Sequence, residues 1–92
     1  MFDPDQFERG RAAFSRGEYF SAHELWEDVW HGLVGSERMF VQGLIQIAAG
    51  LHHLQQHRRR PAVSLLRKGL EKLTRSELQP VKRGDRWTLV RR

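Results

Sequence analysis

The sequence predicts an all-α protein, a compact antiparallel bundle of about four helices with a short irregular C-terminal arm. Three observations favour this fold class: apolar residues recur at helical spacing in four segments, short breaks rich in Gly, Pro or Ser separate them, and no cysteine is present to hold a different fold by disulfides. A chain of 92 residues is expected to form one domain. We expect its core to span residues 4–78 and its basic arm residues 79–92.

The first two helices are predicted from their start signals. Asp3 is an N-cap followed by proline at the first helical position, which places the first helix at residues 4–16. Residues 21–24 (SAHE) form a capping-box pattern, so the second helix begins there or one turn earlier, at Gly17-Glu18, and runs to about Leu33.

The third helix is expected over residues 37–57, after a short break in which Ser36 is the expected N-cap. So short a connection makes the second and third helices antiparallel neighbours. Apolar residues cover more than half of the third helix, which makes it the most buried element. Gly43 and Gly50 cost helix propensity there, and close packing of a neighbouring helix would explain their presence.

The last helix is predicted to begin at Pro61 and to end near Leu78, after Arg58, Arg59 and Arg60 break the pattern. The remaining residues include a β-prone stretch, Trp87 to Val90. A lone strand has no partner inside a helical bundle, so we expect an extended arm or a small irregular cap.

Charge divides the chain into two unequal halves. Residues 1–50 carry four arginines against eight acidic residues, net −4, whereas residues 51–92 carry twelve Lys or Arg against three acidic residues, net +9. Such asymmetry suggests either an anionic partner for the C-terminal half or association of copies into a homo-oligomer. No signal-peptide pattern or long apolar run is present, so we expect a soluble cytoplasmic protein without membrane contact.

The segment SAHELWEDVW, residues 21–30, contains the best candidate site. At about 100° per residue, His23 and Glu27 border the apolar side of the second helix and should be partly buried, whereas Glu24 faces outward. Counting outward from the connection places Gln46 and Gln42 of the third helix nearest to them. We therefore predict a polar pocket between the two helices, formed by His23, Glu24, Glu27, Trp30, Gln42 and Gln46.

Three interpretations of these residues remain open, and a fourth interpretation of the protein concerns its basic C-terminal half. His23 and Glu27, spaced i and i+4, can share a divalent metal ion, and a small metal-dependent hydrolase would use His23, Glu24 and Glu27. HExxE nevertheless lacks the second histidine of the zinc motif HExxH. The pair can also act in acid–base catalysis, or simply hold two helices together. The absence of a recognisable nucleophile favours a non-catalytic protein that requires no cofactor.

The fourth interpretation is nucleic-acid binding by the basic C-terminal half. Arginine clusters neutralise phosphates, although no known nucleic-acid-binding motif accompanies them. The candidate anion-binding residues are Arg58, Arg59, Arg60, Arg83 and Arg86.

Two segments, GEYFSAHELWEDVW (residues 17–30) and RMFVQGLIQIAAGLHHL (residues 38–54), resemble a bacterial and archaeal family known as domain of unknown function 309. The resemblance covers about residues 7–73 and implies a small all-α bundle without an established activity. The motif positions that it carries over are His23, Glu24, Glu27, Trp30, Gln42, Gly43 and Gln46. It gives no support to a role for the basic arm.

Overall fold

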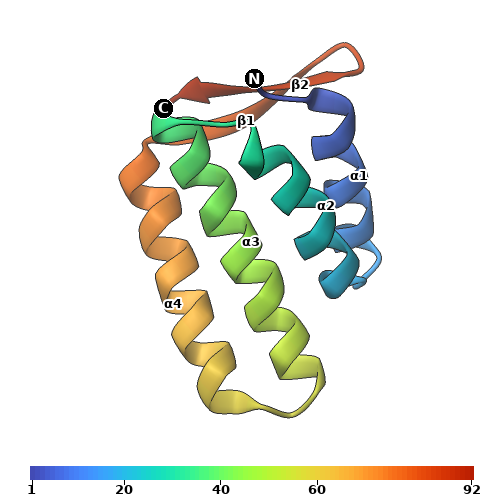
Figure 1. Cartoon of the computed structure of the whole chain (residues 1–92), viewed down its shortest axis with the longest axis vertical. Helices are drawn as coiled ribbons and strands as arrows, with labels where there is room; N and C mark the ends of the chain where they lie inside the picture. Colours follow the sequence, from blue (N-terminus) through green and yellow to red (C-terminus); the bar gives the residue numbers. More distant parts are fainter.

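The computed structural model describes all 92 residues, which form four helices and a C-terminal β-hairpin (Figure 1). The helices are α1 (Pro4–Ser15), α2 (Tyr19–His31), α3 (Gly35–Gln55) and α4 (Arg59–Ser76), and the strands are β1 (Leu78–Arg83) and β2 (Arg86–Arg91). The helices run alternately up and down, which confirms the predicted antiparallel helical bundle. No helix combines the length and apolar character that a membrane crossing requires.

Helix α3 lies at the centre of the bundle, with α4 on one side and α2 on the other, and α1 packs against α2 (Figure 1). The buried core is aromatic where α1, α2 and α3 meet, and it contains Phe7, Trp26 and Phe40. The indole Nε1 of Trp26 donates a hydrogen bond to the carbonyl oxygen of Phe7 at 3.1 Å. This bond satisfies the polar atom of a large buried side chain and fixes α1 against α2.

The contact between α3 and α4 depends on glycine, as the sequence predicted for α3. A Cβ atom at Gly43 would lie 2.8 Å from the carbonyl oxygen of Gly69, and a Cβ at Gly69 would lie 2.7 Å from that of Gly43. Real Cβ atoms do not approach backbone oxygens this closely, so both positions need glycine for the two backbones to meet.

The start of α2 agrees with one of its two predicted positions, and α3 starts two residues before the predicted residue 37. Helix α2 begins at Tyr19 because Gly17, at φ +79°, reverses the chain just before it; of the two predicted starts, the earlier is correct. Ser21 therefore lies inside the helix and forms no capping box. Helix α3 starts at Gly35, with Val34 rather than Ser36 as its N-cap, because Gly35 adopts a positive φ of +63°.

The ends of α4 also differ from the prediction. The helix begins at Arg59, so the arginine run does not break the pattern but supplies the first turn. It ends at Ser76 because Glu77 adopts a left-handed conformation, φ +58°, which terminates an α-helix.

The C-terminal arm is a correction to the predicted fold, because it is a regular antiparallel hairpin and not irregular. The β-prone stretch finds its partner in the preceding residues of the same arm, so that Pro80 pairs with Leu89 and Lys82 with Trp87. Gly84, at φ +65°, forms the tight turn with Asp85. The prediction considered only partners within the helical bundle and so missed this pairing.

The hairpin is attached to the first helix by a charged hydrogen bond. Trp87 Nε1 donates to Glu8 Oε1 at 2.6 Å, and Glu8 also accepts two bonds of 2.8 Å from the Arg11 guanidinium. Hydrogen bonds from Arg11 and then from Trp87 lower the pKa of the Glu8 carboxyl to about 2. Leu78 and Leu89 of the two strands are buried in the core.

Candidate functional site

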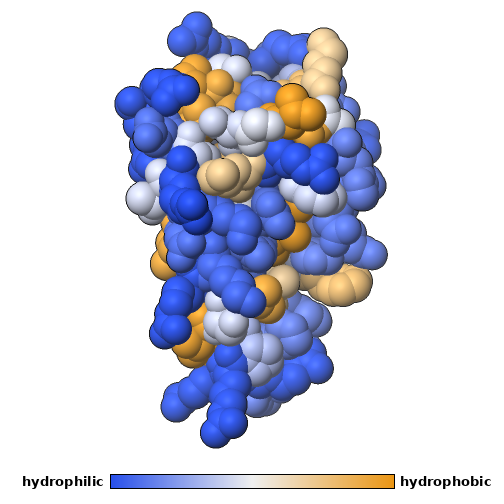
Figure 2. Space-filling view, turned by 60° about the vertical axis from the view of Figure 1, so that its left-hand side comes forward, coloured by the Kyte–Doolittle hydropathy of each residue, from blue (hydrophilic) through white to orange (hydrophobic).

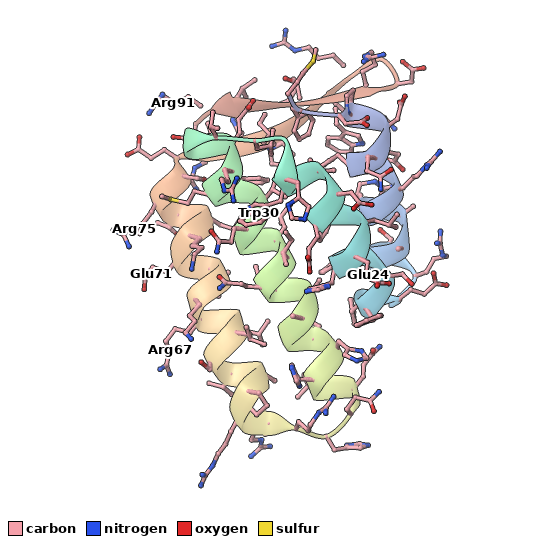
Figure 3. The ribbon with its side chains drawn as sticks, viewed as in Figure 1. Glu24, Trp30, Arg67, Glu71, Arg75 and Arg91 are labelled. Atoms are coloured by element: carbon pink, nitrogen blue, oxygen red, sulfur yellow. The ribbon has the colours of Figure 1, made fainter.

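The segment SAHELWEDVW occupies most of α2 and divides its side chains between the core, α3 and solvent. Trp26 and Val29 are buried in the core. The His23 side chain is 26% exposed and that of Glu27 is 42% exposed, so both lie at the edge of the buried face. Glu24 is exposed on the outer side of the helix, whereas Trp30 lies between α2 and α3 (Figure 3).

His23 and Glu27 form a pair on consecutive turns of α2. The Nε2 atom of His23 lies 2.9 Å from Glu27 Oε1. Nε2 therefore lies on the side of the ring that faces Glu27, whereas Nδ1 is buried without a hydrogen-bond partner in the protein. Phe20 stacks on the same imidazole, with ring centroids 6.0 Å apart and planes inclined by 14°. The ring is therefore held in one orientation from two sides.

A depression of about 200 Å³ lies between α2 and α3, directly beside this pair. It is lined by Glu27, Trp30, Gln42, Ile45 and Gln46. The structure thus brings together four of the six residues that the sequence assigned to a pocket. The Arg38 guanidinium covers the Trp30 ring, 3.7 Å from its centroid, and provides a cationic wall beside the tryptophan.

His23 lines a second depression, of about 140 Å³, together with Phe20, Ala49, His52 and His53. The count outward from the connection that pairs Gln46 with His23 puts His53 opposite a residue before Tyr19, the first residue of α2, so the count did not bring His53 to His23. The polar stripe of α3, which continues from Gln42 and Gln46 to His53, was the signal that these residues share one side. Phe20 gave no such signal, because a single aromatic residue near a helix start has many possible roles.

Four buried side-chain polar atoms lack a hydrogen-bond partner within the protein, and all four belong to residues lining these two depressions. They are Trp30 Nε1, Gln46 Oε1, His23 Nδ1 and His53 Nδ1. Buried polar groups in proteins are nearly always hydrogen-bonded, so their concentration along one contact between two helices needs an explanation. Elsewhere in the chain every such buried atom has a partner.

His23, Glu24 and Glu27, the residues of the alternative hydrolase, line one open depression of about 450 Å³ on the outer side of α2, together with Phe20, Asp28 and His31. Gln42 and Gln46 lie on the other side, toward α3. No three His, Asp or Glu side chains in the chain are grouped so that they could hold a metal ion. A divalent metal held by His23 and Glu27 alone stays a prediction.

The five candidate anion-binding arginines divide into two separate groups. Arg58, Arg59 and Arg60 lie at the start of α4, whereas Arg83 and Arg86 lie beside the hairpin turn at the opposite end of the molecule (Figure 1). Arg83 and Arg86 line the largest depression, of about 560 Å³, which contains none of the unpartnered polar atoms. We therefore place the candidate site between α2 and α3 despite its smaller volume.

A family model described as "Domain of unknown function (DUF309)" matches residues 7–65. The match covers well over half of the chain and includes α2, all of α3 and every residue of the predicted pocket. It confirms the predicted family, and the chain belongs to it. No curated protein and no solved structure matches the chain.

Proposed function

For this member of the DUF309 family, we propose that the depression between α2 and α3 binds a small polar molecule and that the protein does not catalyse a reaction. The observation that carries the proposal is the set of four buried polar atoms without partners, all on residues lining the two adjoining depressions. The binding pocket itself would be formed by Glu27, Trp30, Gln42 and Gln46.

The energetic cost of these atoms supports a functional role. A buried donor or acceptor without a partner costs about 1–3 kcal/mol, a large fraction of the stability of a small domain. Leucine in place of Gln46 would avoid that cost on a helix that is otherwise largely apolar. A sequence that keeps the amide there has a use for it beyond stability.

The chemistry of the lining indicates the class of ligand. The Glu27 carboxylate and Gln46 Oε1 accept hydrogen bonds, whereas Trp30 Nε1 donates one. A complementary molecule carries two or more N–H donors and at least one acceptor. The volume of about 200 Å³ limits it to a small molecule. A flat primary amide meets both requirements, because small side-chain rotations at the rim would bring the three protein groups to its edge. An amidinium supplies only the donors, but adds a positive charge that faces Glu27.

The lining also supports a non-catalytic role. Neither depression contains Ser, Thr or Lys, and the chain has no cysteine. Acyl transfer through a hydroxyl or thiol therefore lacks its attacking group. His23, His52 and His53 line the second depression and are suited to proton transfer, but neither depression contains a hydroxyl or thiol that they could activate.

The proposal can be tested by NMR with two flat probes, benzamide and benzamidine. We expect millimolar probe to shift the Trp30 indole N–H and the Gln46 side-chain amide signals, and benzamidine to bind better because its charge complements Glu27. Gln46→Leu should weaken binding by about tenfold, the equivalent of one lost hydrogen bond. Gln79→Leu, an exposed site on the hairpin, is the matched control. Unchanged Trp30 and Gln46 signals with both probes would contradict the proposal.

A second candidate function is polyanion binding along α4, favoured by the side chains on its outer edge. Arg67 and Arg75 project from that edge, and Arg91 lies at the adjoining end of the hairpin (Figure 3). Ion pairs with Glu71 and Glu77 occupy Arg75 and Arg91, at 3.2 and 3.0 Å. Arg67 is therefore the decisive residue. If α4 binds nucleic acid, Arg67→Gln should lower both the affinity and its salt dependence; an unchanged salt slope would exclude this surface.

A further inference from the structure

The pair formed by α3 and α4 carries two apolar stripes that the bundle does not cover. On α3 the stripe consists of Ile47, Leu51 and Leu54, and on α4 of Val63, Leu66 and Leu70. The residues of each stripe are separated by four and three positions, the spacing of the a and d residues of a heptad repeat. We call these six residues the α3–α4 stripes.

Both stripes lie on the same face of the helix pair. Gly43 and Gly69 face each other across the contact. Around the axis of α3, at about 100° per residue, the stripe residues lie roughly 20–80° from the direction in which Gly43 faces. Around the axis of α4, the stripe residues lie roughly 60–120° from the direction in which Gly69 faces, with the same sense of rotation along the chain. Because the two helices are antiparallel, rotations of the same sense bring both stripes to one face. Ile47 and Leu66 lie nearest the contact and join the stripes across it.

This face is exposed to an unusual degree for its composition. Leu54, Val63 and Leu70 are 49%, 47% and 58% exposed, and they account for three of the six exposed large hydrophobic residues in the chain. Helix α3 is the one element with which α4 makes extensive contact, so no other element covers the α4 stripe, and Ile47, Leu51 and Leu66 are only partly buried. Figure 2, with α4 brought forward, shows hydrophobic residues interrupting the charged surface.

We propose that a second copy of this chain covers the α3–α4 stripes, so that two α3–α4 pairs form a two-fold symmetric four-helix interface. A face with a and d spacing on two antiparallel helices is complementary to another such face, and a two-fold axis supplies an identical one. The six stripe positions carry no charge. Lys68 and Arg75 of α4 lie on the opposite face of the pair, whereas Arg59 lies on the stripe face, at the N-terminal end of α4 beyond Val63.

The available area is sufficient for a dimer. A helix of 18 residues such as α4 is about 27 Å long, and two adjacent helices present a width of roughly 20 Å. The projected face is therefore about 540 Å², and its accessible area is larger because side chains roughen it. The smaller stable interfaces between proteins bury about 600 Å² on each partner.

The dimer would leave the polar pocket open. Gln42 and Gln46 lie on the side of α3 turned away from the stripes, roughly 60–100° from Gly43 in the opposite sense. The inference is thus independent of ligand binding, and either can fail without the other.

Analytical ultracentrifugation of the unmodified chain tests this inference. We expect the 10.8 kDa chain to sediment as a reversible dimer and Leu70→Glu to raise the dimer dissociation constant on the order of 100-fold, because each interface then buries two uncompensated charges. Val34→Glu is the matched control: Val34 is 80% exposed but lies in the α2–α3 connection, so this variant should remain dimeric.

Circular dichroism melts of each variant show whether the fold is retained, and Val63→Glu, also at a half-exposed site, replaces Leu70→Glu if that variant does not fold. A wild-type chain that remains monomeric at about 1 mM would overturn the inference. It would also be overturned by a dimer that Val34→Glu dissociates and that Leu70→Glu and Val63→Glu leave intact.

Discussion

The two sides of α3 differ in how they meet their neighbours. Toward α4 the backbones approach so closely that Gly43 and Gly69 admit no Cβ atom, and the surrounding contacts are apolar. Toward α2, in contrast, the contact includes two depressions and four buried polar atoms without partners. One helix thus has one side that contributes mainly to stability and another that contains groups unfavourable to it.

This contrast identifies the functional side of a helix when no ligand is known. Close packing has an adequate physical explanation in dispersion and burial, so it requires no function. Polar atoms that are buried without partners reduce stability, and natural proteins keep such features mainly where they serve binding or catalysis. Each of the following predictions tests one part of this comparison, in order of decreasing effect.

The largest effect should come from Gly69→Ala. Its Cβ would meet the Gly43 carbonyl oxygen at 2.7 Å, and the two helices would have to move apart. We expect the free energy of unfolding to fall by about 2 kcal/mol, the cost of overpacking less the gain in helix propensity. Chemical denaturation would measure it, with Gly32→Ala as a control because a Cβ there meets nothing closer than 3.5 Å. Equal stability of the two variants would mean that the α3–α4 contact is less close than described.

An effect of opposite sign is expected from Gln46→Leu, on the other side of α3. The substitution removes an acceptor that is buried without a partner and adds apolar contact. We expect the free energy of unfolding to rise by about 1 kcal/mol while probe binding weakens by about tenfold. Denaturation and NMR titration of one sample would measure both changes. A loss of stability would show that Gln46 is already satisfied, and the two sides of α3 would then not differ in the way we argue.

The smallest effect concerns Glu8, which lies outside both sides of α3 and therefore isolates the contribution of the hairpin. Its pKa is lowered in the folded state to about 2 from an ordinary 4.5, so its stabilising effect is full above pH 4.5 and is lost as the pH falls toward 2. The side chain is 36% exposed, and solvent screening limits the effect to about 1 kcal/mol or less.

Glu8→Gln should therefore lower stability at pH 7 and flatten the loss of stability between pH 4.5 and 2. Thermal melts across that range would measure it. Glu71→Gln, which removes the exposed pair with Arg75, is the control and should change this part of the profile little. An unaltered acid profile in Glu8→Gln would mean that the hydrogen bonds of Glu8 with Arg11 and Trp87 contribute nothing to stability.

The sequence alone was sufficient to predict the four helices, their order and the use of glycine in α3. The helices follow from local periodicity, and glycine inside a helix is unfavourable unless a neighbouring helix packs closely against it. The sequence also predicted that Glu27, Trp30, Gln42 and Gln46 share one depression, since a short connection fixes the register of two antiparallel helices. The position of His53 was missed because counting residues outward from the connection compares backbone positions only. The count ignores the reach of long side chains such as Phe20, His23 and His53, which line one depression.

The hairpin could not be foreseen in the same way. Its strands are short, one contains a proline, and their pairing depends on a turn at Gly84 that also reads as an ordinary break. The attachment of Trp87 to Glu8 depends on tertiary position, which no spacing along the chain reveals. The same holds for the unpartnered atoms, because a count of hydrogen bonds requires coordinates.

The bond between Trp87 and Glu8 joins residues that are 79 positions apart. A contact between such distant positions closes a loop that contains nearly the whole chain. The entropy of closing that loop is offset only once the intervening helices have brought both ends together. The junction between α1 and the hairpin therefore forms late in folding, after α1 has packed against α2.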